Sequence, residues 1–187
     1  MAKTVLGVLL FLVFHTISAQ VPEPDKSPMD ISYAPAGYPI QKFQGKHKNN
    51  LPLARVIYSR PQVNGRTLFG VEIKYNEIWR LGANESTELE LFRLATIGGK
   101  AIPKGRYTLF CIPKTDKWTI IVNKDNDSWG AFSYNQGNDV ARVTIPVERV
   151  SGQRVEYFTM YFNEKNNLVI LWDSIRATVP VAFGSAK

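Results

Sequence analysis

The residues best suited to binding or catalysis lie in one short stretch, residues 79–87, which reads WRLGANEST. Arg80 offers five hydrogen-bond donors in a fixed fork and carries a permanent positive charge, so it can hold a carboxylate, phosphate or sulfate group. The indole of Trp79 provides a flat surface on which a guanidinium group or a ring can stack. Asn84 and Glu85 can bond to hydroxyl groups of a ligand. The stretch is therefore a candidate binding site for an anionic or polyhydroxylated ligand.

The same stretch also has a purely structural interpretation, which we favour on the sequence alone. Gly82 allows the backbone to turn between Arg80 and Glu85, so that the two side chains could form a buried ion pair beneath Trp79. A buried arginine without a partner would be costly, and Glu85 is available to pair with it. In this interpretation the stretch anchors a long loop to the sheet.

Carboxylates elsewhere in the chain provide the alternative of a hydrolase. Two acidic side chains about 5–10 Å apart suffice for glycoside hydrolysis, and the candidates are Glu72, Glu77, Glu85, Asp139 and Asp173. Asp139 and Arg142 are three residues apart in the sequence DVARV, which a local ion pair explains most simply, although both also remain candidate ligand-binding residues. The sequence does not show which carboxylates converge, so no catalytic residue can be assigned.

Several kinds of site are poorly supported by the composition. The chain has two histidines and one cysteine, and His15 lies in the N-terminal apolar segment, so His47 and Cys111 cannot make a transition-metal site or a histidine-based triad. The loop NKDNDSWG lacks the ligand spacing of an EF-hand. We expect no metal and no cofactor. The net charge of +7 comes from scattered lysines and arginines rather than from a stripe, which argues against a nucleic-acid partner.

The N-terminus has the pattern of an exported protein. Residues 1–20 contain Lys3, an apolar run of ten residues and small residues before Gln20, which is typical of a secretory signal peptide. We expect residues 21–27 to be a flexible leader and the mature protein to be soluble, periplasmic or extracellular, with no transmembrane segment. No feature of the sequence indicates an oligomeric state.

Residues 28–185 are expected to form one all-β domain. Short alternating or apolar runs separated by turn signals predict nine or ten antiparallel strands in a β-sandwich, either jelly-roll-like or Ig-like. An extended N-terminal arm should lie on this domain, a strand should cover residues 67–75 after an Asn-Gly turn, and residues 75–83 could contain a short helical turn. The predicted core contains Trp118, Ile120, Phe158, Met160, Phe162, Val179 and Val181.

Six motifs together resemble one family of exported bacterial proteins. They read YSRPQVNGRTLFG, EIWRLGANESTELEL, GGKAIPKGRYTLFCIP, WTIIVNKD, WGAFSYN and DVARVTIPV. The chain resembles the family called domain of unknown function 2911 (DUF2911) from about Pro28 to Phe183. The family has no assigned activity. From the residues themselves we expect a module of the cell envelope with a binding or structural role, and a hydrolase that works with carboxylates and arginine is the runner-up.

Overall fold

The computed structural model describes residues 22–47, 50–152 and 154–184, and this part of the chain is all-β apart from two short helices. The expected signal peptide lies outside the described residues. The helices are α1 (Tyr38–Phe43) and the 3-10 helix η1 (Gln136–Asn138). The strands are β1 (Met29–Ala34), β2 (Ala54–Ser59), β3 (Thr87–Leu91), β4 (Ala95–Ile97), β5 (Lys100–Ile102), β6 (Gly105–Pro113), β7 (Lys117–Asn123), β8 (Asp139–Arg149), β9 (Val155–Phe162), β10 (Leu168–Asp173), β11 (Ile175–Val179) and β12 (Val181–Phe183).

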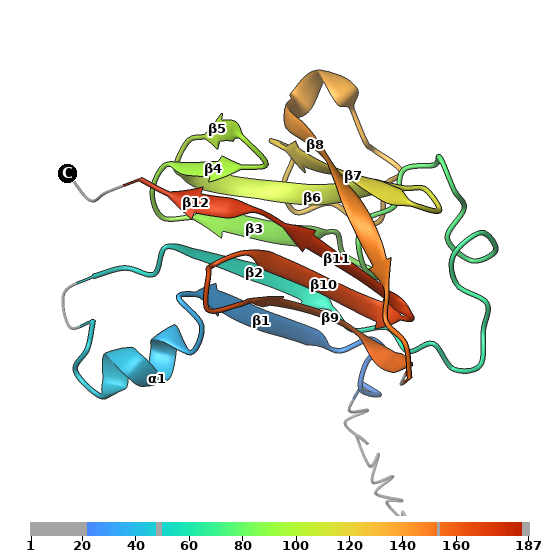
Figure 1. The fold of residues 1–187 in the computed structure, drawn as a ribbon, viewed down its shortest axis with the longest axis horizontal. Helices are drawn as coiled ribbons and strands as arrows, with labels where there is room; N and C mark the ends of the chain where they lie inside the picture. Colours follow the sequence, from blue (N-terminus) through green and yellow to red (C-terminus); the bar gives the residue numbers. More distant parts are fainter. Residues whose placement is uncertain (1–21, 48–49, 153, 185–187) are drawn as a thin grey trace, which may run out of the picture.

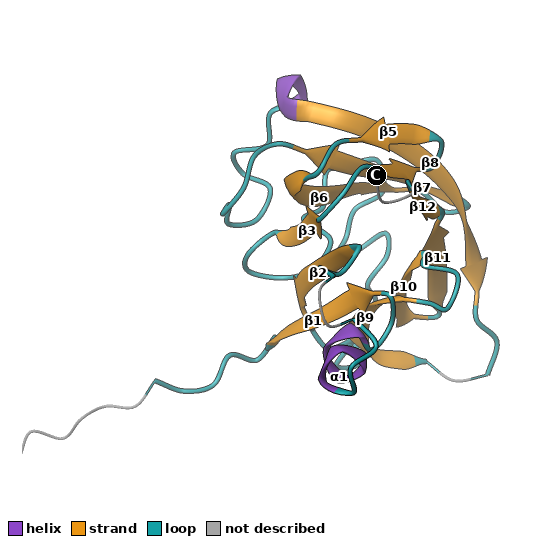
Figure 2. Cartoon of the chain, turned by 90° about the vertical axis from the view of Figure 1, so that its left-hand side faces the viewer, coloured by secondary structure: helices purple, strands orange, loops and turns teal. Residues whose placement is uncertain are grey.

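Nine strands form one antiparallel sheet in the order β1-β2-β3-β6-β7-β8-β11-β10-β9, and this sheet is nearly closed into a barrel (Figures 1 and 2). A small second sheet has the order β12-β4-β5. The chain just after β2 brings the two ends of the large sheet together, because Phe158 N donates to Pro61 O at 2.9 Å and Val63 N donates to Glu156 O at 2.8 Å. The predicted all-β, antiparallel fold is therefore confirmed, whereas the predicted sandwich of two packed sheets is not confirmed. Inward and outward residues alternate along a strand in both architectures, so the pattern could not distinguish them.

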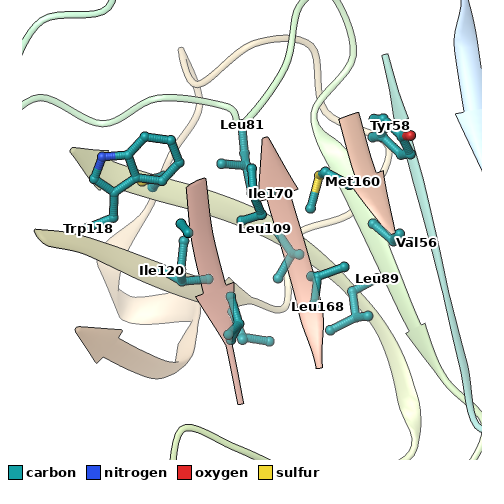
Figure 3. Close-up of a cluster of buried hydrophobic side chains, with 14 of the residues drawn as sticks. Val56, Tyr58, Leu81, Leu89, Leu109, Trp118, Ile120, Met160, Leu168 and Ile170 are labelled. Carbon is teal, nitrogen blue, oxygen red and sulfur yellow. The ribbon is translucent and has the colours of Figure 1, made fainter. Parts of the chain in front are cut away.

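The interior of the curved sheet is filled with side chains. Figure 3 shows Val56, Leu109 and Ile170 from different strands pointing toward one another, with Leu81 entering from a loop. The cavity left among the apolar side chains at the level of Leu89 is about 10 Å³, which is too small for a ligand. The seven residues predicted for the core are all buried, which confirms that part of the prediction.

The N-terminal arm is in part a regular strand. β1 pairs antiparallel with β2 from Met29↔Ser59 to Ala34↔Ala54, and α1 follows it. The strand expected at residues 67–75 is wrong: a single bridge joins Phe69 and Ile73, and the chain turns at Gly70 with φ of 92°. A Cβ at Gly70 would lie 2.9 Å from the ring of Tyr75, so this turn needs glycine. Residues 75–83 contain no helix.

The connection between β2 and β3 carries the candidate site. It runs from Arg60 to Ser86 and is seen on the right of Figure 1. Its backbone is fixed to the barrel at several points rather than at its ends alone, as the bonds of Val63 and Trp79 show. In the described part of the chain, no helix has the length and apolar character needed to cross a membrane.

Candidate functional site

Trp79 fixes the candidate stretch to the barrel. Its backbone N–H donates to Cys111 O at 2.7 Å and its carbonyl accepts from Cys111 N at 2.8 Å, which adds a short bridge to the end of β6. Its indole is 8% exposed and packs among the rings of Phe69, Trp118, Phe158 and Trp172. Most of Trp79 is therefore core, whereas the next residue, Arg80, is only partly buried.

The chain reverses immediately after Arg80. Leu81 has φ of 58°, a left-handed conformation that is strained for a branched, buried side chain. Thr87 holds it by donating its hydroxyl to Leu81 O at 2.6 Å, and Trp79 Nε1 donates to Gly82 O at 3.1 Å. A Cβ at Gly82 would lie 2.9 Å from Ser59 Oγ. The turn thus stores strain next to Arg80. The hydrogen bonds from Thr87 and Trp79 fix its backbone, and the space beside Gly82 leaves no room for a side chain.

Arg80 has no ionic partner among the described residues. Its Nε is buried without a hydrogen-bond acceptor, and no carboxylate of the described chain lies within 4.0 Å of its guanidinium group. Burial lowers the pKa of Arg80 from its usual value. The group nevertheless keeps its charge, because an arginine pKa starts so far above neutrality.

The ion pair expected between Arg80 and Glu85 is absent. Glu85 is exposed, and its backbone forms a bridge to Trp129 instead. Gly130 N donates to Asn84 O at 2.9 Å and Ser86 N donates to Ser128 O at 3.0 Å, so residues 84–86 are held by the loop after β7. The five-residue spacing allowed the pair, but this long-range pairing directs Glu85 elsewhere.

Two hollows lie against Arg80. The larger, about 310 Å³, is lined by Glu72, Ile73, Lys74, Glu77, Ile78, Trp79, Arg80, Ala131 and Phe132. The smaller, about 130 Å³, shares four of these residues and adds Pro61, Arg66, Leu68, Gly82, Ala83 and Trp172. We call the two together the Arg80 hollow. The larger part reaches the lower end of the range usual for small-molecule pockets, roughly 300–1,000 Å³.

The other charges of the Arg80 hollow are paired. Arg66 Nη1 lies 3.6 Å from Glu72 Oε2, and Lys74 Nζ lies 3.9 Å from Glu77 Oε1. Three cationic side chains and two carboxylates line the hollow, which leaves a net charge of +1. That charge belongs to Arg80, because the remaining four groups neutralise one another.

Phe132 forms a wall of the hollow that the sequence did not single out. Its ring is 87% exposed although it lines the larger part of the hollow. Gly130, with φ of 66°, leaves space for it, since a Cβ there would lie 2.7 Å from the Phe132 ring. The motif WGAFSYN was noted, but a phenylalanine in a loop gives no signal of what it faces. Ile73 and Ile78 were missed for the same reason.

The other four predicted ligand-binding residues, Asn84, Glu85, Asp139 and Arg142, lie outside the Arg80 hollow. Asn84 donates its side-chain N–H to Asp25 at 2.8 Å, and neither Asn84 nor Glu85 lines the hollow. Glu72 and Glu77 do line it, whereas Asp173 is bound to Arg154. The candidate carboxylates are therefore split between separate places.

Asp139 and Arg142 belong to a second, self-contained network. Arg142 Nε donates to Asp139 Oδ2 at 2.7 Å, and Tyr134 Oη donates to the same oxygen at 2.7 Å. Asn123 Nδ2 donates to the other oxygen at 2.8 Å. The hydrogen bond to Asp139 raises the pKa of Arg142. The local ion pair predicted from the spacing is confirmed, and it leaves Asp139 little capacity for a ligand.

The described residues contain neither a cluster of metal ligands nor an accessible thiol. Across residues 22–47, 50–152 and 154–184, no three His, Cys, Asp or Glu side chains are grouped so that they could hold a metal ion. Cys111 is fully buried, and burial raises the pKa of its thiol well above the usual value. The thiol is therefore unreactive.

The absence of an ion pair between Arg80 and Glu85 in the described structure gives a first testable prediction. In a double-mutant cycle with Arg80→Met and Glu85→Leu, the coupling free energy should be below about 0.5 kcal/mol, since the two side chains share no contact. Denaturant unfolding of the four proteins measures it. A coupling above about 2 kcal/mol would mean that the ion pair forms in solution.

Comparison with known proteins gives one match. The sequence pattern of a family described as "Protein of unknown function (DUF2911)" matches residues 40–181. No curated protein and no solved structure matches the chain.

Proposed function

Because the chain belongs to the DUF2911 family, whose description assigns no function, we propose from its own geometry that it is an exported binding protein of the cell envelope that holds a small anionic ligand in the Arg80 hollow. The observation that carries this proposal is the buried Nε–H of Arg80, which has no acceptor among the described residues, beside a hollow of ligand size. The pattern of residues 1–20 supports export.

The free-energy cost of leaving Arg80 without a partner supports a binding role for this residue. The Nε–H of Arg80 is buried without an acceptor among the described residues, although the side chain as a whole is only partly buried, and burying a hydrogen-bond donor without a partner is unfavourable. The strained backbone of Leu81 adds a second local cost at the same place. Uncompensated charge and backbone strain cluster at functional sites, where a ligand supplies the missing interaction.

A hydrolase is less well supported than a binding protein. Glu72 and Glu77 line the hollow, but both are exposed and each has a cation beside it. A general acid needs a drier environment than this, and the described lining contains no serine, threonine, cysteine or histidine that could act as a nucleophile or base. Binding therefore accounts for more of the site.

A thermal-shift screen tests the proposal. The panel should contain small organic acids, sulfated and phosphorylated compounds, neutral sugars and amines. An acid present at ten times its Kd should stabilise the protein by about 1.4 kcal/mol, which raises Tm by a few degrees. The shift should vanish in Arg80→Met. Shifts produced by neutral compounds alone, or acid shifts that persist in Arg80→Met, would contradict the proposal.

A further inference from the structure

We infer that the Arg80 hollow is built for a flat, apolar monoanion, such as an aromatic carboxylate, and not for a sugar or a phosphate ester. This inference rests on the proposed function and narrows its ligand to one chemical class. Three features of the hollow carry it: the net charge, the absence of neutral polar side chains from its described lining, and apolar walls that include the exposed ring of Phe132.

The charge of the hollow matches one negative charge. The two ion pairs leave Arg80 as the single uncompensated group, so a monoanion makes the occupied site neutral. A phosphate monoester carries close to two negative charges, and its second charge would face Glu72 and Glu77. No other free cation of the described lining is available to it.

The hollow lacks the side chains that recognise hydroxyl groups. Its described lining contains no serine, threonine, tyrosine, asparagine or glutamine. A sugar buried there would lose hydrogen bonds to water without gaining protein partners, at a cost for each hydroxyl. Asn84, which could have served this purpose, is bound to Asp25 instead. A polyhydroxylated ligand, anionic or not, therefore fits poorly.

The walls suit a flat apolar body. Ile73, Ile78, Trp79, Ala131 and Phe132 provide the uncharged lining of the larger part, and of the two aromatic residues Phe132 is the exposed one whereas Trp79 is 8% exposed. An aromatic face gains from stacking or edge contacts that a puckered ring of equal size makes less well. Phe132 is a nearly fully exposed ring at this wall, so a ligand would cover apolar surface that is otherwise left in water.

The arrangement of Phe132 is fixed by pairing between distant segments. Residues 84–86 follow Arg80 in the chain and bond to residues 128–130, which precede Phe132. Arg80 and Phe132 thereby belong to two segments that these bonds join, and both residues line the hollow. A ligand that carries its charge at one end and its ring at the other matches this layout.

Four probes separate the ligand classes by calorimetric titration. They are 2-naphthoate, its neutral amide 2-naphthamide, the dianion 2-naphthyl phosphate at pH 8, and glucuronate as an anionic sugar. 2-Naphthoate should bind at least about tenfold more tightly than each of the others, since only it combines a single charge with a flat apolar body.

Variants of the two exposed aromatic residues test the wall. Phe132→Ala should weaken the binding of 2-naphthoate about two- to tenfold. Trp129→Ala is the matched control, because Trp129 is 59% exposed in the same loop and lines neither part of the hollow. Its affinity for 2-naphthoate should not change. Equal losses in the two variants would overturn the assignment of Phe132 as the wall.

The outcomes distinguish this inference from the proposed function. If 2-naphthyl phosphate or glucuronate binds more tightly than 2-naphthoate, and Arg80→Met abolishes that binding, the ligand class is wrong and the anion site stands. If 2-naphthoate binds the Arg80→Met variant as tightly as it binds the unsubstituted protein, both the proposed anion site and the inferred ligand class are wrong. No binding of 2-naphthoate at millimolar concentration also overturns the inference.

Discussion

Replacing Phe158 with alanine should lower the free energy of unfolding by about 3–5 kcal/mol, the usual range for removing a buried aromatic ring. Phe158 is fully buried, and its ring makes edge contacts with Tyr58, Trp79 and Trp172, at centroid distances of 5.9, 5.5 and 5.5 Å. Its backbone N–H also bonds to Pro61 O, where the ends of the sheet meet. The cavity left by alanine would therefore lie at the closure of the barrel.

Urea or guanidinium unfolding measures this loss, and Phe132→Ala provides the control. Both changes remove the same ring, but Phe132 is exposed, so its removal should change the free energy of unfolding by less than about 0.5 kcal/mol. A loss below about 1 kcal/mol for Phe158→Ala would show that β9 has a different register. Similar losses of stability in Phe158→Ala and Phe132→Ala would show that Phe158 is not more deeply buried than Phe132.

Most strands could be predicted because apolar and polar residues alternate along them with a period of two. In β9, Phe158, Met160 and Phe162 are buried while the residues between them are more exposed, as the period of two requires. Residues 67–75 alternate in the same manner, yet Gly70 turns the chain there. In that segment Leu68 and Ile73 are buried whereas Val71 is 61% exposed, so the alternation of residue types does not match the burial once the chain turns.

The closure of the sheet could not be predicted from local patterns. The bonds that bring its ends together join Pro61 and Val63 to β9, almost a hundred residues later. The pattern of buried residues is the same whether two sheets stack or one sheet curls. The hydrogen bonds between distant segments decide whether the strands form two stacked sheets or one curled sheet. The residue pattern of a single sequence does not show which distant segments pair.

Two of the six predicted candidate residues, Trp79 and Arg80, line the Arg80 hollow. Trp79 and Arg80 were identified, because an arginine beside a tryptophan in a Gly-containing turn is unusual chemistry for a loop. Glu85 was assigned as the partner on sequence distance alone, and the bridge to Trp129 directs it away. Phe132 enters the site from a different segment, so only the folded arrangement shows it.

Replacing Arg80 with methionine should weaken the binding of 2-naphthoate roughly 30-fold or more, since truncating one partner of a desolvated charge pair costs at least about 2 kcal/mol. The free energy of unfolding without ligand should change by less than about 1 kcal/mol, because Arg80 has no partner to lose and methionine keeps an apolar stem. Glu85→Gln is the control, since Glu85 is exposed and outside the hollow. It should leave the affinity unchanged.

The central claim is that Arg80 is the counter-charge of the bound anion, and the side-chain N–H resonance of its Nε tests this most directly. This N–H is buried without an acceptor, and it can be assigned in a ¹⁵N spectrum by its absence from Arg80→Met. On titration with 2-naphthoate the resonance should move until the site is saturated, whereas the Nε–H of Arg154, already bound to Asp173, should not. An Arg80 resonance that stays in place while 2-naphthoate saturates the protein would contradict the claim.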